Sequence, residues 1–299
     1  MSSLPVDAAR SLGDPATGPR DGERLPPVCI LAGGLGTRLG GRVRDTPKPL
    51  LEVAGEPFLI HQLRLLAAHG AHTVVLCVGY RGEQIQLRVG TELFGIEIRY
   101  SFDAIPGRDG TLGAIRRARG LLGERFLVLY GDTYLQIDYR AVASAWAQSG
   151  MPALMTVFRN EGRWDTSNAV YRDGVVVRYD KRSPTPEMLW IDYGLGGLTS
   201  GALDRAPGRE EDLAALYGLL AKRRELMGFE ANARFYEIGT VRALTETAAF
   251  LAARDASTGT DLIECPAVDN GTRHIARSHS VEGSDSGGEG GDRPSTPRP

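Results

Sequence analysis

The sequence predicts an α/β fold: a doubly wound, mostly parallel (Rossmann-like) sheet with helices on both faces, followed by a smaller β-rich part. Two observations predict it. Short apolar runs typical of buried strands alternate with amphipathic helical patterns over the first half of the chain. A glycine-rich loop and a Gly-Asp pair directly follow two of these runs, where ligand-binding segments lie at the carboxyl ends of parallel strands.

The first half of the chain provides the alternation. Residues 56–69 place Leu59, Leu63 and Leu66 on one stripe and stop before Gly70, which predicts a helix. In this half we predict strands at 28–31, 73–78, 96–102 and 126–130, and helices at 56–69, 82–89 and 111–122.

From residue 152 onward the pattern changes to short strands with few helices between them. We expect this β-rich part to hold a second ligand. Strands are predicted at 153–158, 169–171, 175–179 and 189–198, and amphipathic helices at 211–227 and 241–253.

Both ends of the chain differ from the middle in composition. Residues 1–26 are rich in Pro, Gly, Asp and Arg, and residues 256–299 contain almost no large apolar side chain. Such segments bury too little surface to offset the entropy of ordering them. We therefore predict one domain over residues 27–255, between two disordered tails.

Charge and cysteine usage exclude several classes of protein. A net charge of −2 gives no reason to expect nucleic acid or an anionic membrane as a partner. The scattered Cys29, Cys77 and Cys265 match neither a disulfide framework nor zinc-ligand spacing. The sequence has neither the apolar core of a signal peptide at its start nor an apolar run long enough to span a bilayer, so a cytoplasmic location is expected.

Residues 31–50 predict a nucleoside triphosphate site. Gly33, Gly34 and Gly36 follow the first strand and let bare amide groups face phosphate oxygens. Arg38 adds a planar fork of donors, and Lys48 adds a compact charge between two prolines. Neither a dinucleotide fingerprint nor a P-loop is present, because the third glycine falls one place late and no Gly-Lys-Ser/Thr follows.

Asp132 is a candidate metal ligand. It follows a buried strand directly, and Gly131 lets the chain bend so that the carboxylate can point into a crevice. Mg²⁺ prefers a few carboxylates together with phosphate oxygens and waters, so one such carboxylate suits a metal that arrives with a nucleotide.

Two motifs together resemble a known family. Gly-Gly-Leu-Gly-Thr-Arg-Leu at 33–39 and Pro-Lys-Pro-Leu at 47–50 resemble the sugar-1-phosphate nucleotidyltransferases, the NDP-sugar pyrophosphorylase-like enzymes that make NDP-sugars from an NTP and a sugar phosphate. Within this family, the chain most resembles bacterial heptose- and mannose-1-phosphate guanylyltransferases. The resemblance implies a nucleotide-binding set of Leu31, Ala32, Gly33, Gly34, Gly36, Thr37, Asp103, Gly110 and Thr111.

The resemblance also implies the rest of the site. Arg38, Lys48 and Lys181 correspond to its catalytic cations, and Lys181 would hold the sugar phosphate. Asp192, Tyr193 and Gly194 would contact the sugar. Mg²⁺ would be bound by Asp132 and Glu237, although Glu237 stands where the family carries Asp, and its extra methylene pushes the carboxylate outward.

The expected reaction is transfer of a nucleoside monophosphate to a sugar 1-phosphate, with GTP slightly favoured because Asp103 can accept hydrogen bonds from guanine. The expected partners are two small molecules, the NTP and the sugar 1-phosphate. Whether the chain forms a homo-oligomer is left open by the sequence. One alternative is a cytidylyltransferase for a non-sugar alcohol phosphate such as phosphocholine, with Trp164, Tyr179 and Trp190 as an aromatic cage. Another is a non-catalytic, nucleotide-binding regulatory subunit.

Overall fold

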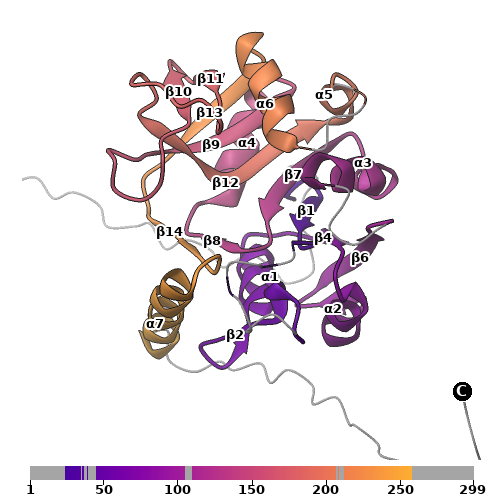
Figure 1. Ribbon diagram of the computed structural model, residues 1–299. Coiled ribbons are helices and arrows are strands. Elements are labelled where there is room, and N and C mark those ends of the chain that lie inside the picture. The colour runs from indigo at the N-terminus through magenta and orange to yellow at the C-terminus, as the bar shows by residue number, and fades with distance from the viewer. Residues whose placement is uncertain are drawn as a thin grey trace, which may run out of the picture. The chain divides into compact units, whose positions relative to one another are not determined.

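A mixed sheet of ten strands runs through the described part of the chain (Figure 1). The computed structural model describes residues 24–34, 36, 39, 45–104, 110–206, 208 and 212–257. In spatial order the strands of the sheet are β10 (Ala169–Arg172), β11 (Val175–Tyr179), β13 (Leu226–Ala231), β9 (Ala153–Arg159), β12 (Trp190–Thr199), β7 (Arg125–Tyr130), β1 (Val28–Leu31), β4 (Thr73–Val78), β6 (Ile96–Phe102) and β5 (Glu92–Leu93).

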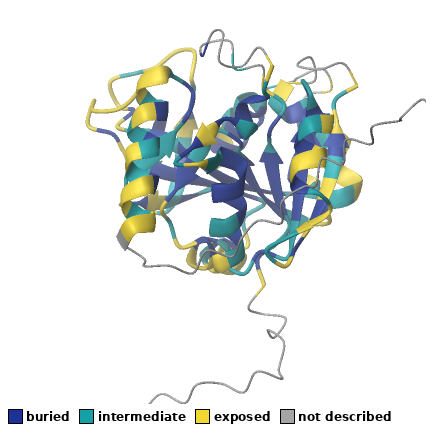
Figure 2. Ribbon diagram, turned by 90° about the horizontal axis from the view of Figure 1, so that it is seen from below, coloured by how far each residue is buried: buried dark blue, intermediate teal, exposed yellow. Residues whose placement is uncertain are grey.

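Helices cover both faces of this sheet, as predicted. Along β1, Val28 and Ile30 face one apolar core and Cys29 faces another, because successive side chains of a strand point to opposite faces. Figure 2 shows the dark, buried strands between the helices. The first core includes residues of α1 (Phe58–Ala68), α2 (Gly82–Val89) and α4 (Tyr139–Ser149), and the second includes residues of α3 (Gly110–Leu122), α5 (Ser200–Leu203) and α6 (Leu213–Lys222).

The sheet has a parallel half and an antiparallel half. Strands β7, β1, β4 and β6 run parallel to one another. Beyond them β12 runs antiparallel to both β7 and β9, and β10 pairs again with β12, which gives this half a barrel-like closure. The α/β class is therefore confirmed. A doubly wound parallel sheet is not confirmed, because pairing of both kinds occurs.

Small elements lie beside the main sheet. β8 (Thr133–Leu135) pairs with β14 (Phe235–Glu237), and β2 (Glu52–Val53) pairs with β3 (Glu56–Pro57). A 3₁₀ helix spans Lys48–Leu50, and α7 (Val241–Ser257) ends the described chain. In the part of the chain that is described, no helix is long and apolar enough to cross a membrane.

Most predicted elements of the parallel half are found within one or two residues of their predicted ends. The helix predicted at 211–227 is wrong in its last five residues. It ends at Lys222, Arg224 has a left-handed φ of 57°, and Leu226 begins β13, which pairs in parallel with β9. Helix α4 was not predicted, although Asp138 caps its first turn through the amides of Arg140 and Ala141.

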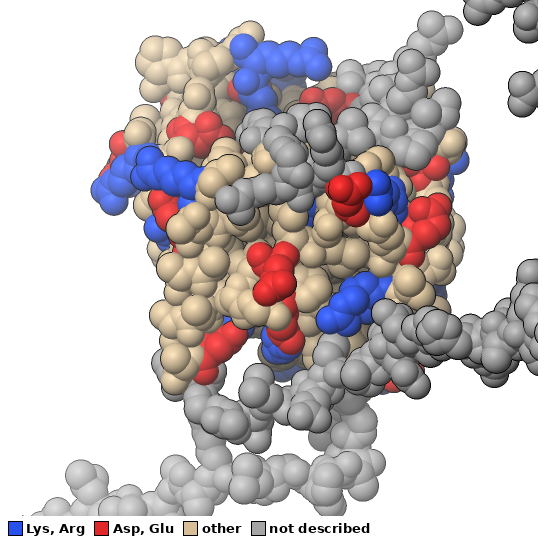
Figure 3. All heavy atoms as spheres, turned by 60° about the horizontal axis from the view of Figure 1, so that its bottom comes forward, with Lys and Arg blue, Asp and Glu red and all other residues tan. Residues whose placement is uncertain are grey.

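The described residues all fall in one compact unit, residues 1–259. The predicted disordered tails, 1–26 and 256–299, lie almost entirely outside the described residues. On the face drawn in Figure 3, described acidic and basic side chains are interspersed. This mixture agrees with the nearly balanced charge of the sequence.

Candidate active site

Two neighbouring cavities share Tyr130 and Asp132 in their walls. The first has a volume of about 440 Å³ and lies at the carboxyl ends of β1, β4, β6 and β7, where Leu31, Cys77, Asp103 and Tyr130 line it. The second has a volume of about 830 Å³ and lies between β12, β14 and the start of α7. The two cavities therefore meet at the end of β7.

The glycine loop after β1 forms one wall of the first cavity. Leu31, Ala32, Gly33, Gly34 and Gly36, all predicted to bind nucleotide, line it. Ala32 donates its amide hydrogen to the carbonyl of Cys77 at 2.8 Å, which fixes the start of the loop against β4. The predicted Thr37 and Arg38 lie outside the described residues.

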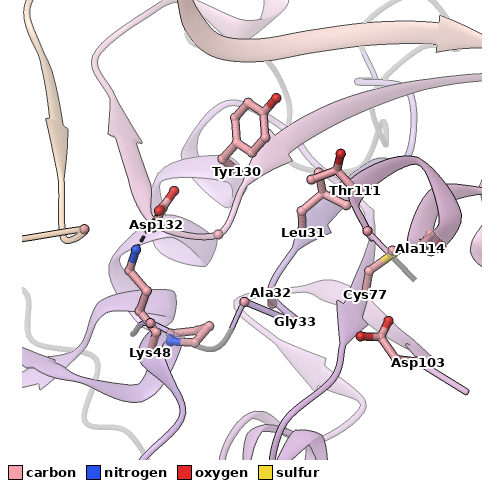
Figure 4. A pocket seen from close by; sticks show the side chains of 16 residues that line it. Leu31, Ala32, Gly33, Lys48, Cys77, Asp103, Thr111, Ala114, Tyr130 and Asp132 are labelled. Carbon is pink, nitrogen blue, oxygen red and sulfur yellow. Dashed lines mark hydrogen bonds and ion pairs between the residues drawn. The ribbon is translucent and has the colours of Figure 1, made fainter. Parts of the chain in front are cut away.

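Asp103 lies on the opposite side of the first cavity from Lys48 and Asp132 (Figure 4). Its carboxylate oxygen Oδ2 approaches two backbones closely: a Cβ built on Gly33 would lie 3.1 Å from it, and one on Gly79 only 2.5 Å. Glycine at both positions therefore makes room for the carboxylate.

Gly110 and Thr111 also line the first cavity, at the first turn of α3. The Thr111 hydroxyl accepts a hydrogen bond from the amide of Leu213 at 2.8 Å, so it also joins α3 to the start of α6. Gly110 has a φ of 63°, in the left-handed region that favours glycine.

Lys48 and Asp132 form an ion pair where the two cavities meet, as the dashed line in Figure 4 marks. Lys48 Nζ lies 2.6 Å from Asp132 Oδ2, and Thr133 donates its hydroxyl to Asp132 Oδ1 at 3.2 Å. The Lys48 side chain is 9% exposed and that of Asp132 is 33% exposed. The lysine is therefore held inside the protein, whereas the carboxylate also reaches solvent.

Two features fix the turn that carries Asp132. Gly131 donates its amide hydrogen to the carbonyl of Leu31 at 3.0 Å, and a Cβ on Gly131 would lie 2.6 Å from that oxygen, so only glycine lets β7 end so close to β1. From the buried face of α1, the amide of Gln62 donates to the carbonyls of Tyr130 and Thr133 at 3.0 and 2.8 Å. Gln62 was not predicted from the sequence.

The backbone segments that carry Glu237 and Asp132 lie side by side. In the β8–β14 pair Glu237 is opposite Thr133, and Ile238 donates its amide hydrogen to the Asp132 carbonyl at 3.0 Å. Both acidic residues line the second cavity. The amide of Gly239 donates to Glu237 Oε2 at 2.8 Å, which holds the longer side chain against its own turn.

The oxygen donors of Asp132 and Glu237 are of the kind that suits a hard divalent cation. Carboxylate oxygens on adjacent backbone segments are the protein ligands that Mg²⁺ prefers, with phosphates and waters completing its shell. Among the described residues no cluster of three or more His, Cys, Asp or Glu side chains could form an all-protein metal site. Two carboxylates leave coordination positions that phosphate oxygens and waters can fill.

Lys181 and Asp192 face one another in the second cavity. Lys181 Nζ lies 3.4 Å from Asp192 Oδ2, and the two side chains are 42% and 6% exposed. Gly194 has a φ of 108° and donates its amide hydrogen to Asp192 Oδ1 at 3.1 Å. A shift in strand register between residues 192 and 196 accompanies this turn, as at a β-bulge, which re-aims side chains.

Tyr193 also lines the second cavity, but its side chain is buried. Its ring stacks on Phe158 at 6.0 Å between centroids and meets Phe235 edge-on at 6.1 Å. The side chain of Tyr193 therefore packs in the core.

An aromatic and charged cluster, not predicted from the sequence, lines the second cavity. The guanidinium of Arg234 lies 4.2 Å from the Trp164 ring and 4.9 Å from the Tyr236 ring, and pairs with Glu246. Trp164 was a candidate for the aromatic cage of the cytidylyltransferase alternative. Its two other members lie elsewhere, with Tyr179 buried and Trp190 packed edge-on against Tyr171, so the three do not form a cage.

Comparisons with known proteins agree with this geometry. The model of the MobA-like NTP transferase domain matches residues 28–234. The catalytic subunit beta of mannose-1-phosphate guanylyltransferase from Drosophila pseudoobscura pseudoobscura is 28% identical over 234 residues, which cover 76% of this chain and 62% of that protein. The D-glycero-alpha-D-manno-heptose 1-phosphate guanylyltransferase of Campylobacter jejuni is 39% identical over 111 residues, 37% of this chain and 49% of that protein.

A solved structure shares the fold. HddC from Yersinia pseudotuberculosis, complexed with GMP-PN, has a TM-score of 0.61 and 24% identity, and the match covers 76% of this chain and all of that one. The present chain spans about three fifths and about half of the length of the two relatives above. Since the family model matches well over half of the chain, the resemblance inferred from the sequence is confirmed, and the chain belongs to the family of nucleotidyltransferases with a MobA-like NTP transferase domain.

Proposed function

We propose that this protein transfers a nucleoside monophosphate from an NTP to a sugar 1-phosphate, giving an NDP-sugar and pyrophosphate. One observation carries the proposal: two cavities meet at Asp132, with Lys48 lining the first and Lys181 the second. A reaction that joins two phosphorylated substrates needs two adjacent sites with a cation in each. The names of the two relatives favour GTP and a mannose or heptose 1-phosphate.

The chemistry follows from this arrangement. An oxygen of the sugar phosphate attacks the α-phosphorus in line, and pyrophosphate leaves, so no covalent enzyme intermediate is needed. Lys48 and Arg38 hold the triphosphate, Lys181 holds the attacking phosphate, and the sugar lies against Asp192, Gly194 and the backbone of Tyr193. Two like charges 4 Å apart repel by about 4 kcal/mol at an effective dielectric near 20, and the lysines offset that repulsion.

Asp132 and Glu237 are the residues that would hold a divalent metal, for which we propose Mg²⁺. When bound, it would neutralise charge on the phosphates. The contribution of the chain itself is to present Asp132 from the turn before β8 and Glu237 from β14, which pairs with β8, and to keep Lys48 beside Asp132. The cytoplasmic location, the homo-oligomer and the domain boundaries stay predictions.

Pyrophosphate release tests the proposal. GTP, UTP, CTP and dTTP are each offered with Mg²⁺ and a panel of hexose, heptose and amino-sugar 1-phosphates, with phosphocholine as the non-sugar acceptor. We expect release that requires a sugar 1-phosphate and is fastest with GTP. Release with phosphocholine alone would favour a cytidylyltransferase, and nucleotide binding without release would favour a regulatory subunit.

Asp103→Ala tests whether Asp103 recognises the guanine base of the NTP. A carboxylate that accepts from guanine N1–H and N2–H₂ discriminates against bases that lack this pair of donors, and a bidentate contact of that kind is worth about 1–3 kcal/mol. We expect kcat/KM for GTP to fall about tenfold or more, with little change for UTP. A loss of the same size for both nucleotides would contradict this role.

Lys181→Ala tests the acceptor site. We expect the KM for the sugar 1-phosphate to rise at least about tenfold, because a charge-assisted contact is lost, while the KM for the NTP changes little. Lys222→Ala is the matched control, since that lysine is exposed at the end of α6. Equal losses for both substrates would argue against the assignment.

A further inference from the structure

Lys181 lies above two tyrosine rings and one buried carboxylate. Its ammonium nitrogen is 5.3 Å from the centre of the Tyr130 ring and 5.7 Å from that of Tyr179. It is also 3.4 Å from Asp192 Oδ2. Tyr179 is the last residue of β11, and Lys181 follows two residues later, so the end of this strand positions both side chains.

Asp192 has further partners that do not depend on the lysine. The Tyr179 hydroxyl donates to Asp192 Oδ2 at 3.0 Å, and the Gly194 amide donates to Oδ1 at 3.1 Å. Burial and the neighbouring Asp192 carboxylate both raise the pKa of Tyr179, so its hydroxyl keeps its proton and remains a donor.

Tyr179 and Lys181 thus share one carboxylate oxygen. A buried carboxylate is costly unless it is paired or hydrogen-bonded, and the side chain of Asp192 is only 6% exposed. A phosphate that binds Lys181 draws the ammonium away from Asp192. The hydrogen bonds from Tyr179 and Gly194 remain and keep the carboxylate satisfied, so the lysine can turn to the phosphate at lower cost.

We propose that Tyr179 is a positioning residue for the acceptor phosphate: its hydroxyl holds Asp192, and its ring, with that of Tyr130, supports Lys181 so that the ammonium is free to bind phosphate. This inference rests on the proposed function, in which Lys181 binds the sugar 1-phosphate. Without the Tyr179 hydroxyl, Asp192 would keep Lys181 as a tighter ion pair. Tyr179 acts through Lys181 and touches no reacting atom.

Tyr179→Phe and Tyr217→Phe are a matched pair of variants. The Tyr217 ring meets that of Tyr179 edge-on at 6.2 Å, and its hydroxyl is buried with no hydrogen-bond partner among the described residues. In pyrophosphate release we expect Tyr179→Phe to raise the KM for the sugar 1-phosphate about tenfold, with the KM for the NTP unchanged. Tyr217→Phe is expected to leave both values within about twofold of the original. Equal effects of the two variants would overturn the inference.

A double-mutant cycle with Lys181→Ala separates positioning from a general structural effect. If Tyr179 acts through the lysine, adding Tyr179→Phe to Lys181→Ala changes the acceptor KM no further. A second, additive increase would overturn the inference while leaving the proposed function intact. Failure of the unsubstituted protein to release pyrophosphate with any pair of substrates would overturn the proposed function and this inference with it.

Thermal unfolding shows whether Tyr179→Phe is folded. If it is not, Asp192→Asn replaces it in the same cycle with inorganic phosphate as the probe, because the amide can keep the hydrogen bond from Tyr179 but carries no charge to hold Lys181. The expected result is stronger inhibition by phosphate against the sugar 1-phosphate, and only when Lys181 is present. Unchanged or weaker inhibition by phosphate, or a change that persists in the Lys181→Ala background, would overturn the inference.

Discussion

Asp132→Asn is expected to lower kcat for pyrophosphate release by roughly a hundredfold or more, the scale of losing one well-placed electrostatic group at a reacting centre. Asp132 lines both cavities, and its backbone carbonyl accepts a hydrogen bond from the amide of Ile238, the residue after Glu237. An amide at this position binds a divalent cation more weakly. We therefore expect the Mg²⁺ concentration needed for half-maximal rate to rise as well.

The same substitution has a second readout that needs no turnover. Lys48 is 9% exposed and would lose the counter-charge that lies 2.6 Å away. Stranding one partner of a buried pair costs about 3 kcal/mol, so thermal unfolding without nucleotide should show a clearly lowered Tm. Asp204→Asn is the control, because Asp204 is a half-exposed partner of Arg119. An Asp132→Asn variant with full activity and an unchanged Tm would contradict both roles of the carboxylate.

Lys48→Met is expected to lower kcat/KM for the NTP by roughly a hundredfold, since a cation that lines the first cavity, the proposed NTP site, is lost. Its effect on stability should be smaller than that of Asp132→Asn, about 1 kcal/mol, because the stranded Asp132 is 33% exposed and water can replace the lysine. Saturating NTP kinetics and thermal unfolding measure the two effects.

The double variant Lys48→Met/Asp132→Asn checks that reasoning. Replacing both partners leaves neither charge stranded, so the double variant should unfold at a higher temperature than Asp132→Asn alone, although both are inactive. Lys222→Met controls for the loss of one positive charge at an exposed position. If Lys48→Met destabilised the protein more than Asp132→Asn, the account of the ion pair based on burial would be wrong.

The sequence was most informative where one residue type has few alternatives. Strands β4 and β6 were predicted at their observed ends, and in β4 this is because residues such as Val74 and Val75 are apolar on both faces of a covered sheet. The glycines after β1 and Lys48 between two prolines are likewise local signals, and the structure brings the described ones to one cavity. Their roles in catalysis stay predictions.

Contacts between distant strands could not be read from local patterns. The hydrogen bond from Tyr179 to Asp192 joins two strands that are not neighbours in the sheet, and the amide of Gln62 reaches a turn 68 residues away. β13 was missed because Leu226 and the residues after it continue the apolar pattern of α6, and only pairing with β9 makes them a strand. In each case tertiary structure decides what the local sequence leaves open.

The pairing of β10 with β12, which closes one half of the sheet, also limits where copies of this chain can associate by pairing strands. Strands with unpaired N–H and C=O groups can add a strand from another molecule, but in the closed half every described strand has partners on both sides. At the other end the two-residue β5 pairs with β6 at Ile96 and Glu97, the Ile98 amide donates to the carbonyl of Thr91, and no described strand pairs with the outer side of β6 beyond these residues. Within the ten-stranded sheet, this flank is therefore where a strand from another copy could add to the described strands through its backbone.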